Sequence, residues 1–159
     1  SPVTGAGVVL ATAPKGSPIY AVKAGSKGVL DDSGLAWTSA EREVWSDVCT
    51  PLFYQGRCYV VNGDRKTIAC VNPATGKADW IGELGTRVKI EASPTGADGK
   101  IYFQNFRGEV FVVAAADEFK LLRTIPLGDD GDNDNRASIA AAQGHLFIRT
   151  GSKLYCVGR

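Results

Sequence analysis

One acidic loop holds the side chains best suited to bind a metal ion. Within residues 129–135, Asp130, Asp132 and Asp134 recur at every second position, a spacing that can bring carboxylate oxygens around Ca²⁺. Compared with an EF-hand loop beginning at Asp130, the sixth position holds Asn instead of Gly, and the twelfth holds Ala instead of Glu. Two interpretations stay open: a calcium site at these three aspartates, or a hydrated polar loop rich in turn-forming residues.

The single histidine is a second candidate for chemistry, because a lone histidine can act as a general base. His145 follows a turn glycine at the start of an apolar run and has no nucleophile or carboxylate nearby in the sequence. This position favours a half-exposed residue at a strand end. A Ser/His/Asp arrangement, whose members meet only in space, stays open.

The sequence contains four cysteines. Cys58 and Cys70 lie at equal distances on either side of Asp64, so a hairpin centred there can place them opposite each other. The alternative is that both are small apolar residues filling a layer between sheets. We expect the alternative, because directly opposed strand pairs seldom form unstrained disulfides. No Cys-x-x-Cys pair occurs, which leaves no basis for a zinc or thioredoxin-type site.

The elements that must position these residues recur about four times along the chain. A turn glycine opens an apolar run at intervals of 49, 43 and 45 residues, at Gly7, Gly56, Gly99 and Gly144. A small residue precedes each glycine by several positions, at Ser1, Thr50, Ser93 and Ser138. Intervals of this length are typical of four-stranded propeller blades.

Nearly every apolar run is short, rich in β-branched or aromatic residues, and bounded by Gly, Pro, Asn or Asp. Helical periodicity is nearly absent. The sequence therefore predicts an all-β protein with about four consecutive β-propeller blades of four antiparallel strands, forming one region over residues 1–159. We place the blades at approximately 1–47, 48–90, 91–134 and 135–159, the last without an outer strand.

Such a partial or half propeller leaves an apolar blade face at each end, which soluble monomers seldom tolerate. We therefore expect a protein partner or a second propeller half, supplied by another copy of the chain or by the remainder of a parent chain. Trp45, in the linker between the first two units, and the insertion at residues 25–32 are further candidates for recognition.

The second unit carries the motifs of a known family. It contains Thr50-Pro51, the strand Tyr59-Val60, and then Thr75-Gly76-Lys77 followed by Trp80, with Asn72 in place of an Asp. This order resembles the PQQ-like β-propeller repeat, and the weaker motifs of the other units extend the resemblance over the whole chain. The resemblance implies that Thr75, Gly76 and Lys77 make the turn into the outer strand. It also implies that Trp80, and Trp37 at the equivalent place in the first unit, dock neighbouring blades.

The PQQ-like group includes quinoprotein dehydrogenases and BamB-type assembly lipoproteins. The former hold their quinone with calcium and an adjacent-cysteine disulfide, and this chain has no adjacent cysteine pair. The resemblance therefore implies a non-enzymatic scaffold for protein–protein interaction or assembly, in the periplasm or elsewhere in the bacterial envelope. No PQQ is expected, and calcium is the one cofactor that stays open. The alternative is a fragment of a quinoprotein-like or sugar-active propeller enzyme.

The charge and the apolar content of the sequence argue against two kinds of partner, nucleic acid and the membrane interior. Eighteen Lys and Arg residues against 17 Asp and Glu give a formal net charge of +1, and no basic run with interleaved aromatics occurs, so we expect no nucleic acid. No apolar stretch approaches the ~18 residues of a membrane span. No signal-peptide pattern opens the sequence, so any export signal is expected outside it.

Overall fold

The computed structural model describes residues 1–13, 16–128 and 131–158 and confirms the all-β prediction. The strands of this part of the chain form four antiparallel sheets, three with four strands and one with three. The strands are β1 (Val3–Gly5), β2 (Val8–Thr12), β3 (Ile19–Lys23), β4 (Leu35–Thr38), β5 (Leu52–Tyr54), β6 (Arg57–Asn62), β7 (Thr67–Val71), β8 (Ala78–Glu83), β9 (Thr95–Ala97), β10 (Lys100–Gln104), β11 (Glu109–Ala114), β12 (Leu121–Pro126), β13 (Ala140–Ala142), β14 (His145–Arg149) and β15 (Leu154–Gly158). Two short 3₁₀ helices, η1 (Asp32–Gly34) and η2 (Arg42–Val44), lie between strands.

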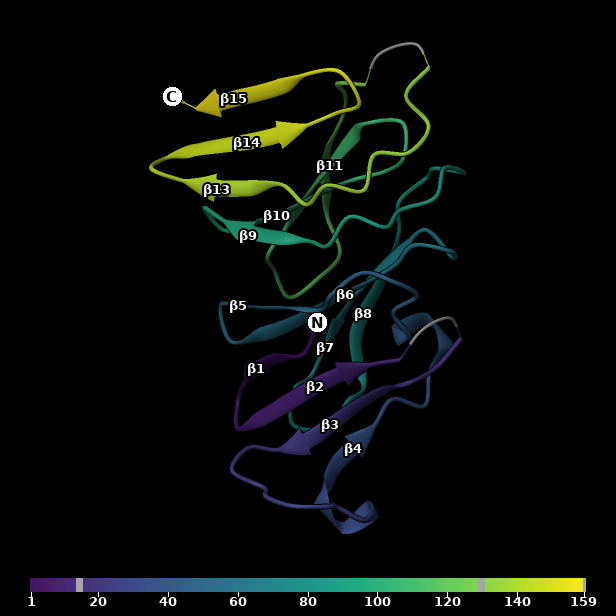
Figure 1. Ribbon diagram of the computed structural model, residues 1–159, viewed down its shortest axis with the longest axis vertical. Helices are drawn as coiled ribbons and strands as arrows, with labels where there is room; N and C mark the ends of the chain where they lie inside the picture. The colour runs from purple at the N-terminus through teal and green to yellow at the C-terminus, as the bar shows by residue number, and fades with distance from the viewer. Residues whose placement is uncertain (14–15, 129–130, 159) are drawn as a thin grey trace.

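Each sheet is a meander whose strands pair in chain order, and we call the sheets blades 1 to 4. The first strands of successive blades adjoin, since β1 contacts β5, β5 contacts β9 and β9 contacts β13. The blades therefore radiate from a common line of inner strands. In Figure 1 they follow one another from blade 1 at the bottom to blade 4 at the top, so the described chain forms an open arc.

The turn between the first two strands explains the repeated glycine. In every blade two residues with positive φ close this hairpin, and their φ angles are 48–51° at the first position and 66–77° at the glycine. Positive φ at both positions is the type I′ turn, whose twist matches that of the flanking strands. The pairs are Ala6-Gly7, Gln55-Gly56, Asp98-Gly99 and Gln143-Gly144.

Apolar side chains fill the layers between the blades. Three clusters of buried residues occupy the interfaces of blades 1 and 2, 2 and 3, and 3 and 4. Strand β7 is buried at all five positions, because its alternate residues face the two neighbouring blades. An inner blade is thus apolar on both faces and depends on its neighbours for cover.

Four small hydroxyl residues join the blades near the inner strands. The nitrogen of Ser1 donates to Thr50 Oγ1 (3.2 Å), the Thr50 N–H donates to Ser93 Oγ (2.9 Å), and the Ser93 N–H donates to Ser138 Oγ (3.1 Å). These are the small residues that open the four repeats. The side chains of Thr50, Ser93 and Ser138 each accept a hydrogen bond from a main-chain nitrogen of the preceding blade. We call this series the hydroxyl relay, and it aligns the repeats residue by residue.

The two repeat tryptophans lie at successive blade interfaces. Trp37 Nε1 donates to the Pro73 carbonyl (2.8 Å), and Trp80 Nε1 donates to the Ala116 carbonyl (3.0 Å), in each case across 36 residues. The indole of Trp37 lies on Gly76, where an added Cβ would come within 2.4 Å of the ring. In blade 3 the equivalent position holds Arg123, which pairs with Val112 as Trp80 pairs with Cys70.

The turn 72–77, including Thr75, Gly76 and Lys77, joins β7 to β8. The Asn72 N–H donates to the Lys77 carbonyl (2.9 Å), and the Gly76 N–H donates to the Asn72 carbonyl (2.9 Å). The Asn72 side chain also accepts from the Ala74 N–H (2.9 Å). The turn thus forms from local hydrogen bonds, while Gly76 at its end provides the flat surface on which Trp37 rests.

Cys58 and Cys70 do not face each other, in agreement with the expectation that both fill layers between sheets. Cys58 pairs with Val71, and Cys70 pairs with Tyr59, so the hairpin centre is displaced by half a residue from Asp64. The two side chains consequently point to opposite faces of blade 2 and lie in different interface clusters, both buried and free. Each fills a layer between blades, as the alternative interpretation predicts.

Within the described residues, no helix is both long and apolar enough to span a membrane.

We predict that Gly76→Ala destabilises the chain by about 2–4 kcal/mol, because it adds backbone strain at φ +74° and overpacks against Trp37. The matched control is Gly56→Ala. Gly56 has a similar φ of +76° and no atom within 4 Å of an added Cβ, so this change should cost only about 1 kcal/mol. Urea unfolding of both variants measures the difference. Equal losses would contradict a packing role for Gly76 at the blade interface.

Candidate functional site

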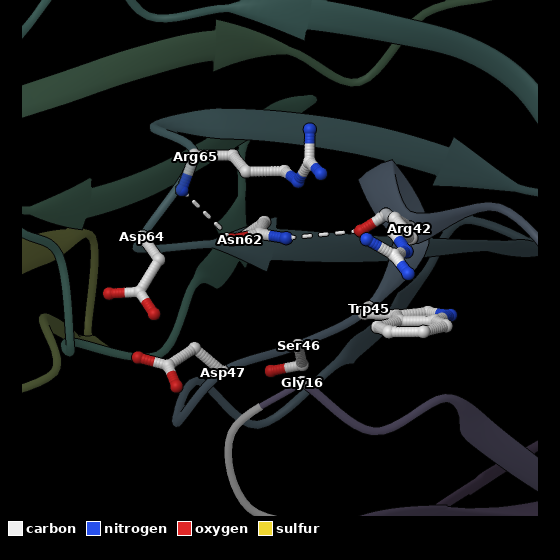
Figure 2. A pocket seen from close by; sticks show the side chains of 8 residues that line it. All are labelled: Gly16, Arg42, Trp45, Ser46, Asp47, Asn62, Asp64 and Arg65. Atoms are coloured by element: carbon white, nitrogen blue, oxygen red, sulfur yellow. Dashed lines mark hydrogen bonds between the residues drawn. The ribbon is translucent and has the colours of Figure 1, made fainter.

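A polar pocket of about 180 Å³ opens between blades 1 and 2. It lies on the edge formed by the second-to-third-strand hairpins and the linkers between blades, which we call the hairpin face. Its lining residues are Gly16, Arg42, Trp45, Ser46, Asp47, Asn62, Asp64 and Arg65. Figure 2 places the carboxylates of Asp47 and Asp64 on the left of the pocket and the guanidinium groups of Arg42 and Arg65 on the right and above.

Local structure positions the basic wall. The 3₁₀ helix η2 presents Arg42, whose guanidinium carbon lies 5.6 Å from the centroid of the Trp45 ring. This distance permits a cation–π interaction. Asn62 joins the hairpin to this helix, since its Nδ2 donates to the Arg42 carbonyl (3.2 Å) and its Oδ1 accepts from the Arg65 N–H (3.0 Å). Arg65 is further held by Glu43 at 3.3 Å.

Asp47 is the least satisfied polar side chain of the pocket. Its side chain is only 3% exposed, and neither carboxylate oxygen has a hydrogen-bond donor among the described residues. Lys89 Nζ lies 3.6 Å from Asp47 Oδ2, close enough to neutralise charge. A buried carboxylate without hydrogen bonds costs about 1–3 kcal/mol or more. Asp47 therefore offers two acceptor oxygens to water or to a bound group that enters the pocket.

Lys89 connects Asp47 to a charge network along the hairpin face. Its Nζ lies 2.7 Å from Glu91 Oε1 and 3.8 Å from Asp64 Oδ1. Glu91 also contacts Arg136 at 3.4 Å. The hydrogen bond to Glu91 raises the pKa of Lys89, burial opposes this, and the charges of Glu91, Asp47 and Asp64 add to the rise. Lys89 is therefore charged at neutral pH.

The hydroxyl relay shows that Asp47 is a departure from the repeat. Asp47, Ile90 and Asn135 each lie three positions before a relay residue, and all three are buried. Ile90 is apolar, and Asn135 donates from Nδ2 to the Phe106 carbonyl (2.9 Å). Asp47 is thus a buried acidic residue at a position where the other repeats have neutral side chains, and this difference makes it a candidate functional residue. Sequence reasoning singled out Trp45 but missed Asp47; aligning the linkers on their hydroxyl residues would have found it.

The insertion at residues 25–32 does not contribute to this pocket. The Ala24 N–H donates to the Gly7 carbonyl (2.9 Å), which places the insertion at the edge that carries the type I′ turns. That edge lies at the opposite ends of β2 and β3 from the hairpin face.

Two aspartates of the acidic loop, Asp132 and Asp134, lie within the described residues, and neither lines the pocket. Asp130 falls outside the described residues. Asp134 Oδ1 lies 2.6 Å from Arg136 Nε, and Asp132 lies against the backbone at Gly151. Over the described ranges, no three His, Cys, Asp or Glu side chains gather as a metal site. Calcium at Asp130, Asp132 and Asp134 stays a prediction.

The histidine and the two buried cysteines of blade 2 are held by contacts typical of residues with a structural role. His145 lies on β14, where its Nδ1 donates to the Gln143 carbonyl (2.8 Å) and its ring covers Gly158. Burial raises the pKa of Cys58 to about 12 and that of Cys70 to about 11, so neither forms a thiolate nucleophile at neutral pH.

A second candidate surface is the face of blade 4 that points away from blade 3. Leu154 is 72% exposed there, whereas its equivalents Ile19, Ile68 and Val110 are 0–2% exposed. These residues are equivalent because each pairs with the last residues of the preceding strand in the same register. Phe147 and Cys156, on the same face, are also exposed. Blade 4 thus carries the apolar positions of an interface without a blade against them in the described chain.

No protein-family profile and no curated protein matches this sequence. Solved structures do resemble the fold. BamB from Moraxella catarrhalis is 13% identical over 99% of this chain and 44% of its own length, with a TM-score of 0.71. The computationally designed Ika4 protein is 14% identical over 99% of this chain and 89% of its own, with a TM-score of 0.70.

The quinohemoprotein alcohol dehydrogenase from Comamonas testosteroni is 16% identical over 94% of this chain and 28% of its own length, with a TM-score of 0.66. This chain therefore spans less than half the length of BamB and of the dehydrogenase. At these identities the likeness concerns the fold alone. The chain has a β-propeller fold, which it shares with proteins of different function.

We predict that Lys89→Met destabilises the chain by about 1–3 kcal/mol at pH 7, because Asp47 loses its counter-charge while staying buried. A second substitution, Asp47→Ile, introduces the residue type of the equivalent position Ile90 and removes the unpaired charge. The double variant should therefore regain most of the lost stability. Because folding raises the Lys89 pKa, its stabilisation is complete below the ordinary value of 10.5 and is lost as pH rises through the folded pKa. The difference between wild type and Lys89→Met in urea unfolding should shrink accordingly. A double variant no more stable than Lys89→Met would contradict the pairing.

Proposed function

We propose that this chain is a non-enzymatic β-propeller scaffold that assembles with other proteins through the outward face of blade 4. The exposure of Leu154, at a position buried in every other blade, carries the proposal. Exposed apolar surface of this kind marks protein interaction sites in soluble proteins. The covering surface must be apolar and shaped like the near face of a propeller blade, because such faces cover the equivalent positions of blades 1 to 3.

Blade 1 of a second copy is the partner that fits. Its outward face carries Val9, Ala11, Tyr20 and Val22, which occupy the places of Cys58, Val60, Ala69 and Val71 in the face that blade 2 turns toward blade 1. In a dimer with a two-fold axis, blade 1 of each copy would cover blade 4 of the other, so that all four end faces would be covered at once.

The polar pocket gives such an assembly a place for further recognition. At about 180 Å³ it is smaller than the ~300–1,000 Å³ typical of small-molecule sites. Its carboxylate and guanidinium walls suit a charged side chain of a bound protein. The resemblance to the PQQ-like group supports the further proposal that the scaffold acts outside the cytoplasm, in the bacterial envelope.

We predict that the purified chain sediments at twice its 16.8 kDa mass and that Leu154→Asp sediments as a monomer, because a charge in an apolar interface cannot be paired. Val29→Asp, on a fully exposed loop of blade 1, is the matched control and should stay dimeric. The Cys156 thiol should react more slowly with a thiol reagent as the concentration of wild-type protein rises.

A wild-type chain that stays monomeric at every concentration, with Cys156 equally reactive throughout, would overturn this assembly. The enzymatic alternative is tested on the same samples. A rise in melting temperature with PQQ and calcium together would favour a quinoprotein fragment. A rise with calcium alone would instead support a site at the acidic loop.

A further inference from the structure

The inner strands of blades 1 to 3 are sealed by one aromatic ring at each interface. Between blades 1 and 2, the ring of Phe53 lies on Gly5, where an added Cβ would come within 2.5 Å of it. Between blades 2 and 3, the ring of Tyr54 lies on Gly96, also within 2.5 Å of an added Cβ. The Tyr54 hydroxyl accepts from the Gly99 N–H (2.9 Å). In both cases a large side chain on one blade meets a glycine on the next.

The interface of blades 3 and 4 lacks this ring. The strand registers make Ala97 the equivalent of Gly5 and Tyr54, and Ala141 the equivalent of Phe53 and Gly96. Both sides of the interface therefore carry a small residue. A hollow of about 850 Å³ lies at this place, lined by Gly96, Ala97, Asp98, Tyr102, Ala141, Ala142, Gln143, Gly144, His145, Leu146, Val157 and Gly158.

The hollow keeps the surroundings that hold Tyr54 one interface earlier. Its lining combines apolar side chains, among them Tyr102 and Leu146 from facing blades, with the polar residues Asp98, Gln143 and His145. Gly144 occupies the place of Gly99 in the type I′ turn, so its N–H corresponds to the donor that binds the Tyr54 hydroxyl. Its volume falls within the ~300–1,000 Å³ range of small-molecule sites.

We propose that this hollow is a binding site for a phenolic ring, which takes the place of the missing aromatic side chain and accepts a hydrogen bond from the Gly144 N–H. Tyr102 and Leu146 provide apolar contact for the ring, and the turn amide orients its hydroxyl. The site is distinct from the outward face of blade 4, because Leu146 and Val157, which line the hollow, alternate along their strands with Phe147 and Cys156 of the outward face.

The test uses p-cresol, the side-chain analogue of tyrosine, titrated into the ¹⁵N-labelled chain and followed by amide shifts. We expect saturable shifts centred on Ala97, Ala141 and Gly144, and at least fivefold weaker binding of 4-methylcyclohexanol, which has a similar size without a flat ring. N-acetyl-tyrosinamide is titrated in parallel. Tighter binding than p-cresol assigns the site to a tyrosine of a partner protein, and weaker binding assigns it to a free phenolic ligand.

A plugged variant provides the matched control. Ala97→Tyr combined with Ala141→Gly rebuilds the Tyr54–Gly96 pair, and Ala141→Gly alone leaves the hollow open. The plugged variant should lose p-cresol binding at least tenfold and melt at a higher temperature, while Ala141→Gly alone keeps binding. Shifts that do not saturate, or that are scattered over the wild-type chain, would overturn the site whether or not the plugged variant folds.

Discussion

The structure depends on one constraint: a blade that is apolar on both faces must be covered on both faces. Blade 2 is covered by blade 1 on one face and by blade 3 on the other, and all five residues of its strand β7 are buried. No four-stranded sheet of this kind can bury its own faces, so stability belongs to the interfaces more than to the individual blades. The hydroxyl relay and the two docking tryptophans act at these interfaces, where they fix how one blade meets the next.

The positions that break the repeat are therefore the informative ones. Ile90 and Asp47 occupy equivalent buried places, yet one completes an apolar layer and the other faces a polar pocket with Lys89 as its nearest counter-charge. Similarly, Phe53 and Tyr54 seal two interfaces, whereas Ala97 and Ala141 leave the third one hollow. At the inner-strand positions the registers match from blade to blade, so the difference there can be attributed to the side chains. A repeat protein thus supplies internal controls for its own functional sites.

The exposed face of blade 4 follows from the same constraint. Leu154 occupies a position whose equivalents lie under a neighbouring blade, and the described chain has no blade against it. The outward face of blade 1 presents the complementary kind of surface. Assembly through these faces needs no new type of contact, because the three internal interfaces already show how such faces pack.

The sequence by itself determined the strands and the turns, because these depend on residues within about ten positions of one another, and it determined the repeat length, because the same local pattern recurs. The type I′ turns at the repeated glycines and the small residues that open each unit are examples. Only the tertiary structure decided the register that separates Cys58 from Cys70, the contact of Trp37 with Gly76, and the meeting of Asp47 with Lys89. The register is set where the two strands of one hairpin pair, and a shift of one residue in the pairing moves a side chain to the other face. The other two contacts depend on packing between blades, which joins residues about 40 positions apart and is not encoded in any local pattern.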